Sequence, residues 1–172
     1  FIKVYMQVMG LADHLLRGQQ PAAGMALMAR EEANFRRALS VAAARGLRSE
    51  LQNLADTLRL YLERAGRNRE REALTEWVRA RLPDDVLDGA ACASICDHAW
   101  TLFTQGKAQE ALGMVQELLQ RLQSEGLAGG ENPTSQIAFG YGYLGRIFMA
   151  AHRPDLALTP LREAVVRFEQ LQ

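Results

Sequence analysis

Two cysteines and a histidine, Cys92, Cys96 and His98, are the residues whose types and spacing come closest to those of a metal site. Cys92 and Cys96 are one helical turn apart, so a helix would direct both thiols to one side. His98 would lie well around the helix from both, and a fourth ligand is not evident, whereas tetrahedral zinc requires four converging groups. Both cysteines also share an apolar stripe with Ile95. We therefore expect them to pack in a core as small apolar side chains, and we expect no metal and no cofactor.

Residues that could act as acids, bases or nucleophiles are scattered. None of His14, His98 and His152 stands in a recognisable pairing with a serine, a cysteine or a carboxylate, which general-base catalysis requires. The adjacent carboxylates Glu31–Glu32 and Asp84–Asp85 would point to different faces of a helix or cap one, so they do not form an acid–base pair. We expect no catalytic residues and a protein that is not an enzyme, although catalysis dispersed over several helices stays open.

Charge argues against nucleic acid as a direct partner. Lys and Arg number 20 and Asp and Glu number 20, so the formal net charge is zero, whereas a nucleic-acid-binding face usually carries a basic excess. The locally basic run 64–71 is interleaved with glutamates, which favours a solvated turn face over a phosphate contact. No apolar run approaches the length of a membrane span. With two cysteines and no visible signal peptide, a cytoplasmic segment of a longer protein is the expected origin.

The elements that would position these residues are all helical. Apolar residues recur at helical spacing along the whole chain, and no alternating run of β-branched residues indicates a sheet. Ser49 and Asn132 are predicted N-caps, and Pro160 is predicted to bend the last helix or to follow its start closely. The spacing predicts eight helices: 2–16, 25–44, 49–65, 68–82, 86–104, one from Gly106 through Leu122, one opening at Pro133, and one after His152.

These helices are predicted to form antiparallel pairs. Breaks within pairs fall at Gly66, Gly106 and His152, and each pair has more apolar surface than it can bury alone, so neighbouring pairs should stack. The expected fold is all-α, a right-handed superhelical stack with an irregular pair at 1–46 and three repeats at 47–83, 84–126 and 132–172, in one continuous domain. The core stripes are expected to include Ala33, Leu39 and Ala42, Leu144 and Phe148, and Ala157, Leu161, Ala164 and Phe168.

The last pair carries the residues of a known repeat. Tyr141, Leu144–Gly145, Phe148, Ala157, Leu161 and Ala164 resemble the spaced signature of the tetratricopeptide repeat (TPR). The stretch 96–118 resembles a second copy, best in Gly106-Lys-Ala-Gln-Glu-Ala-Leu112, and 54–78 resembles a third that lacks the usual aromatic after Gly66. The resemblance implies a helical scaffold that binds a protein partner.

A second resemblance lies upstream. Ala29-Arg-Glu-Glu-Ala-Asn34-Phe-Arg-Arg-Ala-Leu39 is similar to a segment of STAND-type signal-transduction ATPases that precedes a C-terminal TPR array. This resemblance implies the regulatory arm of a larger signalling ATPase or transcription regulator. A phosphate-binding Gly-x-x-x-x-Gly-Lys-Ser/Thr motif is absent from the sequence, so the nucleotide-binding part would lie elsewhere.

In a TPR stack the first helices of successive pairs line a concave groove. In the register above, the residues facing it would be Asn53, Asp56, Leu60, Glu63, Trp100, Arg146 and Met149. Trp100 would be either a peptide anchor or a filler between pairs, and Arg146 would bind a ligand carboxylate or a neighbour such as Asp97. The predicted function is binding of a protein or peptide in this groove. The alternative is a sensor that binds a small molecule in the same groove. Exposed terminal repeats would also allow self-association.

Overall fold

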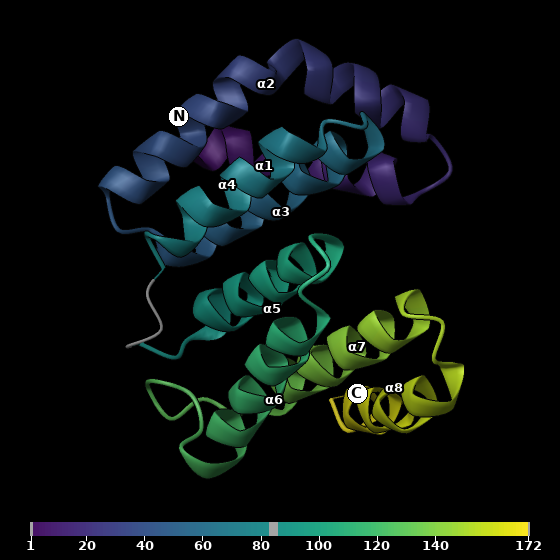
Figure 1. Ribbon diagram of the computed structural model, residues 1–172. Helices are drawn as coiled ribbons and strands as arrows, with labels where there is room; N and C mark the ends of the chain where they lie inside the picture. Colours follow the sequence, from purple (N-terminus) through teal and green to yellow (C-terminus); the bar gives the residue numbers. More distant parts are fainter. Residues whose placement is uncertain (1, 83–85, 172) are drawn as a thin grey trace. The chain divides into compact units, whose positions relative to one another are not determined.

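The computed structural model describes residues 2–82 and 86–171, and within them every regular element is an α-helix (Figure 1). No helix in these residues is both long and apolar enough to cross a membrane. The predicted all-α class is confirmed. The eight described helices are α1 (Ile2–Arg17), α2 (Pro21–Ala44), α3 (Arg48–Arg64), α4 (Asn68–Arg79), α5 (Gly89–Thr104), α6 (Ala108–Ser124), α7 (Thr134–Ala150) and α8 (Pro154–Glu169).

Tight turns with a left-handed residue join several of these helices. Gly46, Gly66 and Gly106 have φ of 64°, 71° and 84°, values that glycine adopts without a Cβ clash. After α5, the Gly106 amide donates to the Phe103 carbonyl and the Lys107 amide donates to the Leu102 carbonyl. This pair of bonds is a Schellman motif, and it satisfies carbonyls that the end of a helix leaves free. Such a turn reverses the chain within two or three residues, which makes the helices antiparallel.

The turn between α7 and α8 has the same hydrogen bonds but no glycine. His152 has a φ of 57°, its amide donates to the Met149 carbonyl, and the Arg153 amide donates to the Phe148 carbonyl. A left-handed histidine is strained, because its Cβ crowds the backbone. The break that the sequence predicts at His152 is therefore confirmed, and the turn geometry is imposed at a conformational cost.

Helix starts differ from the prediction at four places, one of them α5, which begins at Gly89 and not at residue 86. Helix α2 begins at Pro21, so the predicted start at residue 25 is too late. Proline has no backbone N–H, but the N–H groups of the first helical turn have no partner within the helix, so its absence there costs little. The predicted N-cap Ser49 is wrong, since α3 begins at Arg48 after Leu47. Asn132 is one residue too early to be the N-cap of α7, where Pro133 stands, but its Oδ1 accepts bonds from the amide and hydroxyl of Thr134 at 3.0 and 2.6 Å.

Helix α5 has a side-chain cap that the sequence reading missed. Asp88 is the N-cap, and its carboxylate accepts a 2.8 Å bond from the Ala91 amide. An anionic cap also suits the positive end of the helix dipole. The sequence predicted this role for Asp84–Asp85, which lie outside the described residues.

The chain divides into two compact units, Phe1–Leu82 and Pro83–Gln172. In the first, α1 packs on α2 and α3, α2 also packs on α3, and α3 packs on α4. The second repeats this scheme: α5 packs on α6 and α7, α6 also packs on α7, and α7 packs on α8. Each unit is thus two stacked helix pairs in the order expected for a helical repeat, and the first helices of its two pairs are in contact.

Apolar side chains fill the interior of each unit. In the first, Phe35 is 1% exposed and Tyr5 contacts its ring edge-on at a centroid distance of 5.8 Å. In the second, one buried cluster contains both cysteines together with residues of α5, α6 and α7. Burial of apolar side-chain surface between helices is the main source of stability of such stacks.

Some predicted core residues are not buried. Ala33 is exposed on α2, whereas Leu39 and Ala42 are buried as predicted. On α8, Ala157 and Ala164 are buried, but Leu161 and Phe168 remain 37% and 43% exposed because only one side of α8 is covered by α7. Pro160 is buried within α8, six residues after its start.

Candidate functional site

The seven predicted groove residues fall into both units. Asn53, Asp56, Leu60 and Glu63 lie on α3 of the first unit, whereas Trp100 lies on α5 and Arg146 and Met149 lie on α7 of the second. The first group shares one helix, and the second lies on two helices that are in contact. A single groove that joins both groups stays a prediction.

In the second unit, Trp100 and Arg146 are in direct contact. The guanidinium carbon of Arg146 lies 3.7 Å from the centroid of the Trp100 ring, a close cation–π contact. The neighbouring Phe103 ring stacks on Trp100 at a centroid distance of 5.5 Å and an interplanar angle of 27°. Trp100 is half-buried and packs against the core of the unit. It is therefore neither a fully exposed anchor nor a buried filler, but a ring held between the core and a cation.

A hydrogen bond joins the same two helices one turn away. The Tyr143 hydroxyl on α7 donates to Oδ1 of Asp97 on α5 at 2.6 Å. Phe139, one turn before Tyr143, contacts its ring at 5.7 Å and is 50% exposed. We name Asp97, Trp100, Phe103, Phe139, Tyr143 and Arg146 the α5–α7 surface. It presents aromatic rings, a guanidinium and a carboxylate at the contact between the first helices of two adjacent pairs.

Sequence reasoning named Trp100 and Arg146 but missed Phe139 and Tyr143 as members of this surface. The spacing of residues in the sequence contained a signal for Tyr143. Asp97 and Tyr143 are 46 residues apart, the same spacing that separates Trp100 from Arg146. Residues at equal positions in the first helices of neighbouring repeats lie on the same face of the stack. The repeat register therefore predicts this set of residues.

The groove residues of the first unit border a different feature. Asn53 and Asp56 line an open cavity of about 230 Å³ between α1 and α3, together with Met9, Gly10, Asp13, Arg17 and Thr57. The Asp56 carboxylate accepts bonds from Gln52 Nε2 at 2.8 Å and Arg59 Nη1 at 2.7 Å. Leu60 is half-buried and Glu63 is exposed. The charged groups at this cavity are thus engaged within the unit, since Asp13 also pairs with Arg17 at 2.8 Å.

A small apolar cavity adjoins the α5–α7 surface. It measures about 200 Å³, and Phe139 belongs to both features; the other lining residues are Gly89, Cys92, Ala93, Cys96, Ser135, Gln136 and Phe168. Cavities for small organic ligands are usually about 300 Å³ or larger. This one would therefore hold only a small apolar group without rearrangement.

The cysteines beside this cavity are unreactive in character. Cys92 and Cys96 are 3% and 1% exposed and belong to the core cluster, so the predicted core packing is confirmed. Burial, with a smaller contribution from Asp88, raises the pKa of Cys92 to about 12. Burial also raises the pKa of Cys96. Metal ligation and nucleophilic catalysis both need thiolates, and the described residues contain no cluster of three or more His, Cys, Asp or Glu side chains placed to share an ion.

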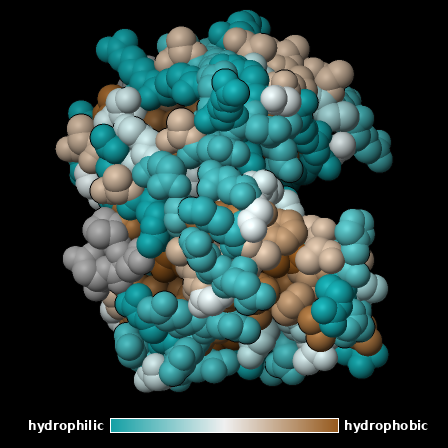
Figure 2. Space-filling view, in the orientation of Figure 1, coloured by the Kyte–Doolittle hydropathy of each residue, from teal (hydrophilic) through white to brown (hydrophobic). Residues whose placement is uncertain are grey.

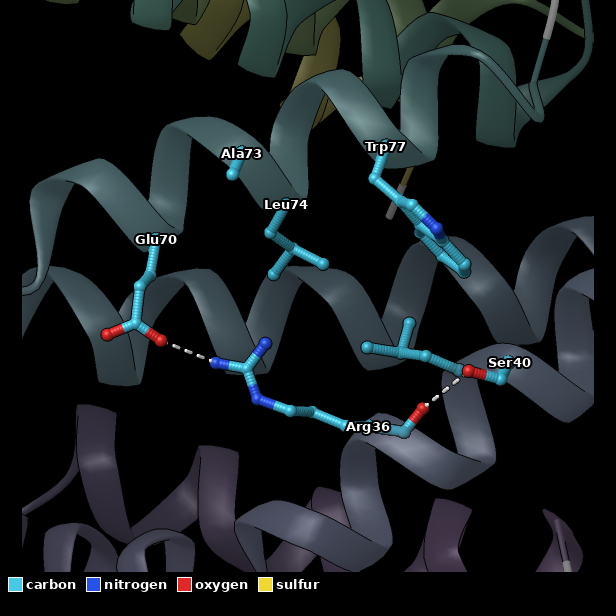
Figure 3. A pocket seen from close by; sticks show the side chains of 7 residues that line it. Arg36, Ser40, Glu70, Ala73, Leu74 and Trp77 are labelled. Carbon is cyan, nitrogen blue, oxygen red and sulfur yellow. Dashed lines mark hydrogen bonds and ion pairs between the residues drawn. The ribbon is translucent and has the colours of Figure 1, made fainter.

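A larger open cavity lies between α2 and α4. It measures about 330 Å³ and is lined by Arg36, Leu39, Ser40, Glu70, Ala73, Leu74 and Trp77. In Figure 3 the side chains of Leu74 and Trp77 extend from α4 toward α2, with Arg36 and Ser40 opposite. The guanidinium carbon of Arg81 lies 3.9 Å from the Trp77 ring centroid. Sequence reasoning did not predict this cavity, because it lies between the second helices of two pairs.

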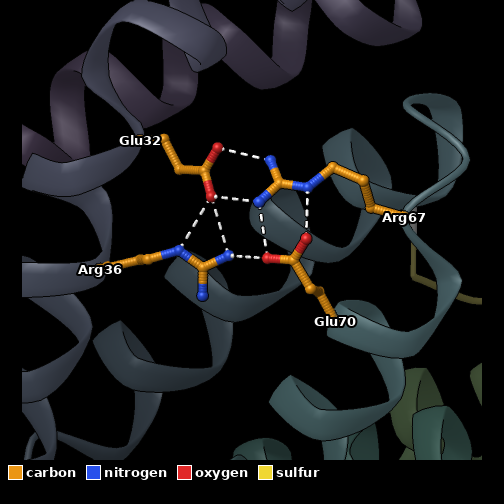
Figure 4. A network of polar contacts seen from close by, with 4 residues as sticks. All are labelled: Glu32, Arg36, Arg67 and Glu70. Atoms are coloured by element: carbon orange, nitrogen blue, oxygen red, sulfur yellow. Dashed lines mark hydrogen bonds and ion pairs between the residues drawn. The ribbon is translucent and has the colours of Figure 1, made fainter.

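A network of four charged side chains borders that cavity (Figure 4), because Arg36 and Glu70 belong to both features. Arg67 binds Glu32 and Glu70 at 2.6 Å each, and Arg36 reaches the same two carboxylates at 2.8 and 3.0 Å. Hydrogen bonds from Arg67, and then from Arg36, lower the pKa of Glu32 to about 2. Arg67 belongs to the basic run 64–71, and its ion pairs with Glu32 and Glu70 link α2 to the first turn of α4.

Comparison with known proteins supplies one useful finding. No protein-family profile matches the chain, and no curated protein matches its sequence. Among solved structures the chain is similar to BtubC (BKLC) from P. vanneervenii, with a TM-score of 0.56 and 16% identity over 99% of this chain and 73% of the other. At this identity the likeness supports the fold alone, an all-helical stack.

Proposed function

We propose that this chain is a non-enzymatic protein-interaction module that binds a partner peptide on the first helices of its repeats. The observation that carries the proposal is the contact of Arg146 with the Trp100 ring on the α5–α7 surface. Tryptophan, tyrosine and arginine are the residues that most often dominate binding energy at protein interfaces. Here Trp100 on α5 lies opposite Tyr143 and Arg146, which are one turn apart on α7.

The chemistry of the surface suggests a type of peptide. Phe139 and Met149 are 50% and 53% exposed and offer apolar area on α7, and Trp100 on α5 is half-buried. The Arg146 side chain is exposed at the same place, and a guanidinium forms strong paired bonds with a carboxylate. A segment with a large apolar residue and a nearby Asp or Glu would match both features.

The resemblance of 29–39 to STAND-type ATPases suggests the wider context. We propose that the chain is the regulatory arm of a larger signalling ATPase or transcription regulator, and that peptide binding changes how this arm contacts the remainder of the protein. The TPR-like residues of α7 and α8 and the stacked pairs of each unit support this proposal.

A small-molecule sensor is the second candidate. It is favoured by the cavity of about 200 Å³ whose rim includes Phe139 of the α5–α7 surface. A compact apolar metabolite would enter this cavity, and its polar end would lie near Ser135 or Gln136.

Selection from a displayed peptide library tests the main proposal. The test variant is Trp100→Ala with Arg146→Ala, and the matched control is Trp77→Ala with Arg81→Ala, which removes the same two residue types and a similar cation–π contact at 3.9 Å. We expect enriched peptides with an apolar residue and a carboxylate, and an affinity loss of about tenfold or more in the test variant only. Circular dichroism checks that both variants remain folded.

Other results would overturn it. Equal loss of binding in both variants would show that the α5–α7 surface is not the site. If no peptide is enriched and native mass spectrometry detects a bound metabolite that Phe139→Ala releases, the sensor replaces the peptide-binding module.

A further inference from the structure

Helix α8 carries an exposed apolar seam. Leu158, Leu161, Val165 and Phe168 are spaced by three, four and three residues, so they form one stripe along the helix. They are 51%, 37%, 55% and 43% exposed. Leu161 and Phe168 lie at the inner edge of the stripe: Leu161 packs close to Gly145 of α7, and Phe168 lines the cavity beside Phe139. Seven of the twelve large exposed apolar residues in the described chain lie between Leu156 and Leu171, and Figure 2 shows apolar surface in the region of α8.

The equivalent seam of α6 is covered. When the left-handed turn residues Gly106 and His152 are aligned, the counterparts of the α8 seam are Leu112, Val115, Leu119 and Leu122, which are all apolar. The last three are at most 5% exposed and Leu112 is half-buried. At Leu119 the cover is α7, since a Cβ placed on Gly140 would lie 2.8 Å from Leu119 Cδ2, and α5 also packs on α6. The exposed stripe of α8 therefore corresponds in sequence to the stripe of α6, and α6 packs on α7, the first helix of the next pair.

Helix α1 carries the complementary face. Aligning the ends of α1 and α7 places buried Ala12 at the position of buried Gly145. In this register Val4 and Leu11 stand where α7 has Ile137 and Leu144. The α7 residues, on the stripe of Gly140, are 6% and 7% exposed, whereas Val4 and Leu11 are 56% and 54% exposed.

The one departure from the α6–α7 contact is compensated. Gln7 of α1 stands where α7 has Gly140, so it would bring extra volume to the closest point of the interface. Opposite it, α8 has Val165 where α6 has Leu119, and the shorter side chain leaves room. A net charge of zero also means that two copies do not repel each other strongly.

We propose that α8 of one copy binds α1 of a second copy of this chain, in the manner in which α6 binds α7. The interface uses a different surface on each partner, so it is heterologous and permits more than two copies to join. It goes beyond the proposed peptide binding and uses no residue of the α5–α7 surface.

Two single substitutions test the interface. Val165→Arg disables the α8 face and Val4→Arg disables the α1 face; both residues are more than half exposed, so the fold should persist. We expect the mass of the unmodified chain in sedimentation to rise with concentration. Each variant alone should stay monomeric over the same range, because its self-association is weakened about tenfold or more. An equimolar mixture of the two variants should form a one-to-one dimer, because it retains one intact α1 face and one intact α8 face.

Val166→Arg is the matched control, since Val166 is 49% exposed on α8 but lies off the seam. It should associate like the unmodified chain. A chain that is monomeric at every concentration would overturn the proposal. So would association that Val165→Arg abolishes and Val4→Arg leaves intact, because that result means a symmetric contact between two α8 helices.

Discussion

The left-handed His152 allows the cost of one backbone conformation to be measured. His152 occupies the turn position that Gly66 and Gly106 occupy in the other pairs, with a φ of 57° against 71° and 84°. A left-handed residue with a Cβ costs about 1–2 kcal/mol. Glycine removes that cost but also gains about 0.4–1 kcal/mol of freedom in the unfolded chain. His152→Gly should therefore stabilise the fold by about 0.5–1 kcal/mol.

The reverse substitution is the control. A Cβ on Gly106 would meet no atom within 4 Å, so Gly106→His introduces left-handed strain without a clash and should destabilise by about 1 kcal/mol. Both turns lie in the second unit, which also contains Trp100. Urea unfolding followed by tryptophan fluorescence in a Trp77→Phe background therefore reports on the unit that contains both substitutions.

In thermal unfolding the same free energies correspond to roughly 1–4 °C in the melting temperature if the 172 residues unfold together, and to about twice that if the second unit unfolds alone. Unchanged or lower stability of His152→Gly, with Gly106→His also neutral, would refute the reasoning. It would mean that backbone conformation at these turns does not limit stability.

Three further predictions follow from contacts within the units. The pKa of Glu32 is lowered to about 2, so its contribution to stability is present above the unfolded pKa near 4.5 and is lost as the pH falls toward 2. Glu32→Gln should reduce the change in the free energy of unfolding across that window by about 1 kcal/mol in urea titrations; an unchanged pH dependence would exclude Glu32 as its source. A Cβ on Gly145 would overlap Leu161 Cδ2, so Gly145→Ala should lower the free energy of unfolding in urea by about 1–3 kcal/mol. Adding Leu161→Ala to the same chain should restore part of this loss. If the effects of the two substitutions are strictly additive, the close approach is contradicted. Because burial raises the pKa of Cys92 to about 12, iodoacetamide at pH 8 should label both cysteines only after unfolding in urea; rapid labelling of the native chain would show that the core around α5 opens readily.

Local features of the sequence determined the helices and their pairing. Apolar spacing, glycines and the break at His152 act within a few residues, so they fix where helices run and where the chain reverses. The predicted start of α2 was four residues late, because Pro21 suits both the end of one helix and the start of the next. The predicted starts of α3 and α5 were wrong by one and three residues. Long, strongly periodic stretches such as α6 were predicted closely.

Side-chain partnerships were decided by the tertiary structure. Arg67 and Glu32 are 35 residues apart, and Tyr143 and Asp97 are 46 residues apart. Such bonds depend on how far each helix is shifted and rotated against its neighbour, which no short stretch encodes. The burial of Ala33, Leu161 and Phe168 was mispredicted for the same reason. Periodicity shows which residues share a face of a helix, but only the packed neighbours determine whether that face is covered, since burial is a property of two surfaces together.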